Sequence, residues 1–263
     1  MTRRVFLAWL AELLRAMRLW QTWAGPLMAG AAVGLTLPLR PVVRDGRSDY
    51  DFIAQASPMA LGLVGFVMLL VWCAGLLAPE TGSGAVRFYL VRPILRREYV
   101  LAKFLAGAAY AVLLLAVVGG ASWGVAFALG DLQGVAYGGE LVHTREAMFG
   151  AWLLGGLLSL LPLWAGASLA LLASACTRST ATAAMVTLGV WLLLDLVKHP
   201  LGVDAWVFTT YLEAPWQVFV NRCDGLDASW SPMAWRCAAA SLGVTLPSVG
   251  GAMLVLGRRD LTA

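Results

Sequence analysis

Long apolar runs alternate with short polar connections along the whole chain. Each run is close to or above the roughly 20 residues that an α-helix needs to cross about 30 Å of hydrocarbon. The runs cover residues 19–39, 57–78, 104–129, 149–174, 181–198 and 236–256. We therefore predict an all-α polytopic membrane protein with six transmembrane helices, forming a single transmembrane domain over residues 1–263.

The first residues, 1–18, show a different pattern. Charged and small residues recur at steps of three and four on one face, and large apolar residues lie on the other. The polar face holds Arg4, Ala8, Ala11, Glu12, Arg15 and Arg18, and the apolar face holds Phe6, Leu10, Leu13, Leu14 and Met17. This predicts an amphipathic helix that lies flat at the membrane surface. The alternative is an extension of the first span.

The charge of the connections predicts the orientation. One side would hold residues 1–18, 79–103, 175–180 and 257–263, with 12 basic and four acidic residues. The other side would hold seven basic and eleven acidic residues, counting Asp195. Because cytoplasmic loops carry an excess of Lys and Arg, both ends are expected in the cytoplasm, which agrees with an even number of crossings.

Composition supports a membrane location and indicates a partner. Hydrophobic residues make up 60% of the chain and charged residues 13%, against about 25% charged in soluble domains. The net charge of +4 favours anionic lipid over nucleic acid as a partner, because the basic residues cluster at the ends of apolar runs. The abundance of Ala, Gly and Arg, with only two lysines, indicates a bacterial inner membrane.

The largest outer connection, residues 199–235, is too aromatic for a freely solvated loop. Its rings come from Trp206, Phe208, Tyr211, Trp216, Phe219 and Trp230. The segment would either form a re-entrant hairpin, which is tolerated only where protein covers its backbone, or provide an aromatic belt at the outer headgroups.

The sequence holds no arrangement that predicts catalysis, a cofactor or a metal. The only histidines, His143 and His199, fall in outer connections, and no HExxH motif is present. A phosphate-binding P-loop needs Lys followed by Ser or Thr, whereas Lys103 precedes Phe104 and Lys198 precedes a histidine. We therefore expect no enzyme activity from this chain and no nucleotide site of its own.

Two polar features of the outer half leave alternatives open. Asp195 lies three residues before Lys198, so an interfacial ion pair is one interpretation and an intramembrane proton or substrate site is the other. Cys223 and Cys237 both lie near the outer face, where an oxidising compartment would allow a disulfide.

The cytoplasmic connection 79–103 divides into three pieces. Its two glycines permit a sharp turn as the second helix leaves the bilayer, and residues 85–91 predict a short helix with an apolar side. Since the residue before a proline avoids helical angles, the chain should bend again at Arg92, before Pro93. A helix then restarts at 95–103. A short helix held between two bends is suited to docking a partner.

This connection resembles that of the type-2 ABC exporter permeases. In that family an acidic residue, a Gly, an apolar run, a Pro, one or two Arg and a Lys recur between the second and third helices. The matching positions are Glu80, Gly84, Leu90, Pro93, Arg96, Arg97 and Lys103. The ending from Gly257 to Leu261 is also similar, whereas Ala85 and Leu95 depart from the Thr and the Ser or Thr that are usual there.

The resemblance implies that the connection contains a coupling helix that docks on a separate ATPase. The apolar anchors would be Phe88, Tyr89 and Leu90, and the polar contacts would come from Glu80, Arg87, Arg92, Arg96 and Arg97. Two ATPase subunits would carry ATP and Mg²⁺, and a second permease copy would complete a homodimer, or a related permease a heterodimer. The alternative for the arginines is orientation of the chain or binding of anionic lipid.

The function expected from these features is export driven by a separate ATPase. The alternative is a non-transporting membrane component that transmits ATPase-driven force or a signal to an extracytoplasmic partner, through residues 199–235. A proton-coupled carrier would depend on Asp195.

Overall fold

The computed structural model describes residues 3–39, 49–83, 95–130, 132, 134–137, 140–226 and 229–258. The helices along the first part of the chain are α1 (Arg3–Met17), α2 (Trp20–Leu35), η1 (Leu37–Leu39), α3 (Tyr50–Pro58), η2 (Met59–Gly65), α4 (Phe66–Ala74) and α5 (Ala78–Gly82). After these come α7 (Arg96–Leu129), strands β1 (Gly134–Tyr137) and β2 (Glu140–Thr144), α8 (Arg145–Cys176), α9 (Thr180–Lys198), η3 (Asp204–Trp206), η4 (Phe208–Leu212), α10 (Ala214–Cys223) and α11 (Ser231–Arg258).

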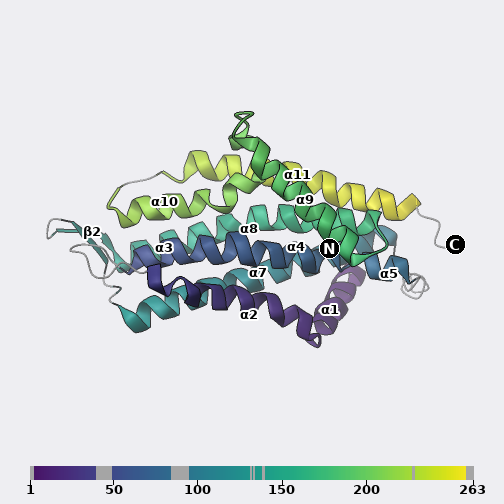
Figure 1. The fold of residues 1–263 in the computed structure, drawn as a ribbon, viewed down its shortest axis with the longest axis horizontal. Coiled ribbons are helices and arrows are strands. Elements are labelled where there is room, and N and C mark those ends of the chain that lie inside the picture. The colour runs from purple at the N-terminus through teal and green to yellow at the C-terminus, as the bar shows by residue number, and fades with distance from the viewer. Residues whose placement is uncertain are drawn as a thin grey trace.

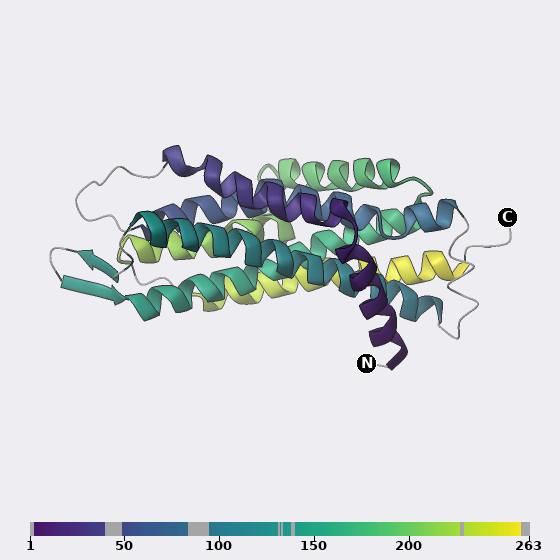
Figure 2. The ribbon, with the colours of Figure 1, turned by 90° about the horizontal axis from the view of Figure 1, so that it is seen from below.

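The long helices form one elongated bundle (Figure 1). Helix α8 packs against α4, α7, α9 and α11, while α2 lies along α7 and η2. Helix α5 and the end of α11 lie at one end of the bundle, and the β1–β2 hairpin lies at the other (Figure 1). Helix α1 leaves the bundle axis at a steep angle near the α5 end (Figure 2). Both ends of the described chain therefore lie toward the same end of the bundle.

Five helical stretches are long and apolar enough to cross a membrane. They are Tyr50–Gly82, Arg96–Ala128, Arg145–Cys176, Thr180–Lys198 and Ser231–Arg258. These match the last five predicted spans, so an all-α polytopic membrane protein is the correct fold class. The first predicted span corresponds to α2, which has 16 residues and continues through a turn of 3₁₀-helix, η1. A count of six crossings stays a prediction.

The second span begins at Tyr50, earlier than the predicted residue 57. Polar side chains hid this extension from the hydropathy pattern, but protein covers them: Asp51 is buried, and the hydroxyls of Ser57 and Ser122 lie 3.1 Å apart across α3 and α7. Pro58 ends α3, and the chain continues as the π-helix η2 before α4. The π-helix keeps the span continuous past a residue that has no N–H to donate.

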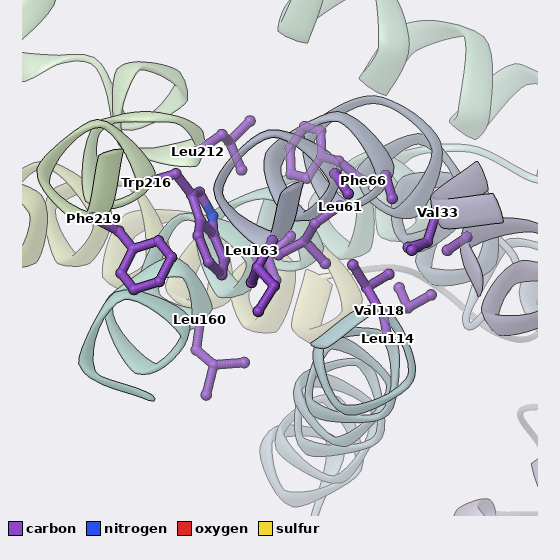
Figure 3. Close-up of a cluster of buried hydrophobic side chains, with 14 of the residues drawn as sticks. Val33, Leu61, Phe66, Leu114, Val118, Leu160, Leu163, Leu212, Trp216 and Phe219 are labelled. Carbon is purple, nitrogen blue, oxygen red and sulfur yellow. The ribbon is translucent and has the colours of Figure 1, made fainter. Parts of the chain in front are cut away.

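The core runs along the centre of the bundle, where α3, α4, α7, α8 and α10 meet (Figure 3). The buried side chains labelled there include Leu61, Phe66, Leu114, Val118, Leu163, Trp216 and Phe219. One close approach depends on a glycine: a Cβ at Gly166 of α8 would lie 2.3 Å from the ring of Phe66. Replacing that glycine would force apart two helices that form the centre of the bundle.

The outer aromatic segment folds back onto the bundle. Helix α10 packs along α3 and α8, and the rings of Phe208, Tyr211, Trp216 and Phe219 are buried. Trp206 instead remains exposed. The segment thus has the protein cover that a re-entrant hairpin requires, together with one exposed ring of the kind found in an aromatic belt.

A hairpin that the sequence did not lead us to expect joins α7 to α8. Strands β1 and β2 are antiparallel, pairing Gly134 with Thr144 and Tyr137 with Glu140, with a bulge between Val135 and Ala136. Its strands have only four and five residues. Strands this short carry too weak an alternation of apolar and polar residues to be recognised beside long apolar helices.

The arrangement predicts which thiols a membrane-impermeant reagent reaches. Cys176 and Leu141 are both exposed, at the α5 end and at the hairpin end of the bundle respectively. We expect Leu141→Cys, in a Cys176→Ser background, to react with an impermeant maleimide in intact cells. Native Cys176 should react only after the membrane is opened. Reaction of both from the same side would contradict this topology.

Candidate functional site

Charged residues from three helices meet inside the α5 end of the bundle, and we call this group the ionic cluster. It consists of Glu12, Arg15, Glu80, Tyr99 and Lys103, from α1, α5 and α7. The members come from positions up to 91 residues apart, because Lys103 is paired with Glu12. These groups are far apart in the sequence and come together only in the folded chain, so we treat the cluster as a candidate site.

Lys103 is the centre of the ionic cluster. Its Nζ lies 2.9 Å from Glu12 Oε2 and 2.9 Å from Glu80 Oε1, and only 1% of the residue is exposed. A buried ammonium is costly unless several acceptors surround it. Two carboxylates from two different helices meet that requirement.

Glu80 receives donors from both sides. Arg15 Nη1 donates to Glu80 Oε1 over 2.8 Å, and the hydroxyl of Tyr99 donates to Glu80 Oε2. Glu80 is only 6% exposed, so these charge-assisted bonds lie largely away from water. One carboxylate therefore fixes α5 against α1 and α7 simultaneously.

Helical spacing explains how the side chains converge. Tyr99 and Lys103 are four residues apart on α7, and Glu12 and Arg15 are three apart on α1, so each pair shares a face. Glu80 follows Pro79 in the first turn of α5, where the helix dipole stabilises a negative charge. Local geometry thus brings three short sets of residues to one point.

A second set of bonds fixes the turn that leads into α5. Ser174 Oγ on α8 accepts the N–H groups of Leu77 and Ala78, over 3.0 and 2.8 Å, and donates to the carbonyl of Ala74. A Cβ at Gly82 would lie 2.4 Å from the carbonyl oxygen of Arg178. The chain therefore passes close to the α8–α9 connection just before residues 85–97, which the sequence predicts to dock a partner and which we call the docking segment.

The far end of the docking segment is fixed as well. Glu98 accepts the N–H of Leu95 over 3.1 Å, which caps α7 although Leu95 has no side-chain oxygen. Arg96 donates through Nη1 to the carbonyls of Leu256 and Gly257, each over 3.0 Å. Because these carbonyls belong to the last turn of α11, the guanidinium ties the start of α7 to the end of α11.

Helix α1 forms as predicted but places its faces differently from a simple surface helix. Glu12 and Arg15 of the polar face point into the ionic cluster, whereas Phe6, Leu10 and Leu14 are exposed. The apolar face remains available to lipid. Immersion of α1 in the membrane surface stays a prediction.

The structure describes three of the proposed docking residues. Glu80 lies in the ionic cluster, Arg96 caps α11, and Arg97 is exposed. The other proposed residues, and the short helix expected at 85–91, lie outside the described part of the chain: Gly84, Arg87, Phe88, Tyr89, Leu90, Arg92 and Pro93.

Sequence reasoning did not foresee the partners of Glu80. The periodicity of residues 1–18 predicts a surface helix for Glu12 and Arg15, and the family resemblance includes Lys103 without indicating a carboxylate partner. The available signal was Lys103 itself, one of two lysines in the chain, set one helical turn after Tyr99 at the mouth of an apolar run. Its carboxylate partners lie too far away in sequence for spacing to identify them.

At the end of α9, the i, i+3 ion pair that is one of the two interpretations of Asp195 is present. Lys198 Nζ lies 2.5 Å from Asp195 Oδ1, and 46% of the Asp195 side chain is exposed. His199 Nδ1 makes a similar contact with Asp204 Oδ1 over 2.6 Å. A proton or substrate site at Asp195 remains a hypothesis.

The disulfide considered between Cys223 and Cys237 is not formed, and both are free and buried. They belong to separate apolar clusters: Cys223 lies with Trp216 and Phe219, and Cys237 lies with Tyr211. Burial, followed by the nearby charges of Asp51 and Asp224, raises the pKa of the Cys223 thiol. The thiolate needed for oxidation is correspondingly scarce.

We therefore predict that all four cysteines of the purified chain are free thiols before any reductant is added. Denaturation without reductant, followed by iodoacetamide and mass measurement, should add four alkyl groups. In the folded chain Cys176 should react first, because it is exposed while the other three are buried. Two alkyl groups on the denatured chain would instead demonstrate a disulfide.

A stability test addresses the ionic cluster. Lys103→Met would remove the buried cation that pairs with Glu12 and Glu80, leaving Glu80 with Arg15, and breaking such a buried pair costs about 3–5 kcal/mol of unfolding free energy. Lys198→Met is the matched control, since its partner Asp195 is nearly half exposed and the loss should be about 1 kcal/mol or less. Equal losses in denaturant unfolding in detergent would contradict a special role for Lys103.

Comparison with known proteins agrees with this architecture. A family model described as "ABC-2 family transporter protein" matches residues 30–221. The match covers α3 to α9, α10 up to Asn221, the docking segment and Glu80. No curated protein matches the chain.

Proposed function

Since the chain belongs to the ABC-2 family of transporter proteins, we propose that it is the membrane-spanning subunit of an exporter driven by a separate ATPase. The ATPase would dock on the docking segment, residues 85–97, which runs from the connection after α5 into the first residues of α7. ATP and Mg²⁺ would bind on the ATPase. This chain would supply no catalytic group, and its expected location is a bacterial inner membrane.

The observation that carries the proposal is the attachment of both ends of the docking segment to the bundle. At the near end, Glu80 bonds to Arg15, Tyr99 and Lys103. At the far end, Arg96 bonds to the last turn of α11. A push on the segment would therefore move α1, α7 and α11 together rather than deform a loop.

Rigid movement of packed helices is an established way of switching a membrane path. Serine hydroxyls and small residues allow such packing along α8: Ser159, Gly166 and Ser168 are all buried. Two copies of the chain, or one copy with a related permease, would surround a central path, with two ATPase subunits below. ATP-driven closure of those subunits would tilt the helices and expose the path to the other side.

A second candidate function is mechanical. The β1–β2 hairpin extends beyond the end of the bundle opposite α5, and its Leu141 and Val142 are exposed (Figure 1). An extracytoplasmic partner that binds there, or on residues 199–235, would receive the same movement without any cargo crossing. If the recruited ATPase turns over at a rate that no candidate substrate alters, the mechanical function gains support.

Deletion of residues 85–91 tests the proposed docking directly. We expect the deleted chain to lose co-purification with the nucleotide-binding subunit while remaining folded, because the ionic cluster lies outside the deletion. The control removes residues 135–143 of the hairpin and should retain the ATPase. Retention of the ATPase without residues 85–91 would contradict the proposal.

Arg96→Ala tests the attachment at the far end. The ATPase should still bind, whereas ATP-driven conformational change should fall about tenfold or more if two charged hydrogen bonds of about 1.5–3 kcal/mol each are lost from the force-bearing contact. Arg97→Ala is the control, because Arg97 is exposed. Equal effects of both substitutions would argue against the proposed connection to α11.

A further inference from the structure

A hollow of about 630 Å³ lies beside the ionic cluster, and we call it the α1–α2 pocket. It is enclosed by α1, α2, α4, α5 and α7, with Thr180 at the start of α9 on its edge. Its volume falls within the range of sites that bind small molecules. Glu80 lines this pocket and also holds the near end of the docking segment.

The α1–α2 pocket is polar at one end and apolar along its length. Four members of the ionic cluster, Glu12, Arg15, Glu80 and Lys103, form the polar end together with Ser83, and Met68, Val71, Trp72 and Leu76 line the apolar wall. Trp72 stacks on Tyr110 with ring centroids 4.4 Å apart, which makes that wall flat and firm. Such a gradient fits a molecule with a charged head and a hydrocarbon tail.

The accessible charge of the polar end is positive. Two carboxylates, one ammonium and one guanidinium cancel formally, but they differ in exposure. The side chain of Arg15 is 55% exposed, against 12% for Glu12, 8% for Glu80 and 2% for Lys103. A ligand in the pocket would therefore meet the guanidinium before any carboxylate. A guanidinium matches the oxygens of a phosphate in shape as well as charge.

The level in the membrane at which we expect the pocket to lie is that of the lipid headgroups. Helix α1 exposes Phe6, Leu10 and Leu14, as a helix lying in the membrane surface does. Trp20, at the junction of α1 and α2, lines the pocket and is exposed, as aromatic residues at the headgroup level are. The polar end then lies among the headgroups, and the apolar wall extends toward the hydrocarbon.

We propose that the α1–α2 pocket binds one anionic phospholipid of the cytoplasmic leaflet. Its phosphate lies against Arg15, and one acyl chain follows Met68, Val71 and Trp72. The lipid fills the space between α1 and α4 and so joins the surface helix to the second span. This inference rests on the membrane placement of α1 and does not require the ATPase.

Native mass spectrometry of the purified full chain in detergent tests the site. The probes are dioleoylphosphatidylglycerol and dioleoylphosphatidylcholine, which share their tails and differ in net charge. We expect one phosphatidylglycerol to bind about tenfold tighter than phosphatidylcholine, the ratio that corresponds to 1.4 kcal/mol. Arg15→Gln should remove most of that preference, and Arg18→Gln, in the exposed turn after α1, should retain it.

A second variant tests the pocket without changing a charge. Ala24→Phe places a ring in the pocket wall and should prevent binding of either lipid, whereas Ala31→Phe, on an exposed part of α2, should not. Thermal unfolding of each variant confirms that the chain is folded. Equal binding of both lipids, equal effects of the paired variants, or displacement by millimolar inorganic phosphate would overturn the proposal. Failure of ATPase recruitment would leave this result unaffected.

Discussion

The pairing of Lys103 with two carboxylates is the interaction on which the α5 end of this protein depends. Burying any of these three charges alone would cost several kcal/mol in lost hydration. Paired with one another, they hold α1, α5 and α7 together at one point. A buried ionic group of this kind is a poor source of stability compared with apolar packing. What it provides is a fixed geometry, because few arrangements satisfy all its members at once.

That geometry matters because the rest of the bundle is held by contacts with little directionality. Apolar side chains pack equally well against lipid and against each other, so close packing and scattered hydroxyl bonds decide which helices pair. The bond between Ser57 and Ser122 and the approach of Phe66 to Gly166 are examples. Directional bonds thus fix the charged end, whereas close packing determines the arrangement along the apolar length.

The helical fold followed from hydropathy, whereas the docking segment stays a prediction that rests on its glycines, its proline and the family resemblance. Five predicted spans overlap long apolar helices, since long apolar runs have few alternative structures in a membrane, although two of these helices begin seven and eight residues before the predicted starts. The start of the second span at Tyr50 was missed because Asp51 reads as exposed, and only tertiary contact with α10 and α7 covers that segment. The partners of Glu80 were missed for the same reason: pairs separated by 65 and 19 residues leave no periodic signal.

The π-helix between Met59 and Gly65 divides the second span into two parts. Each hydrogen bond there reaches one residue further than in an α-helix, so a return to the α pattern would turn α4 about its axis by one residue position relative to α3. The α3 part of the span packs on α10, and the α4 part leads to Ser174 and Glu80. A change of helical register at η2 would therefore rotate one part of the span without rotating the other.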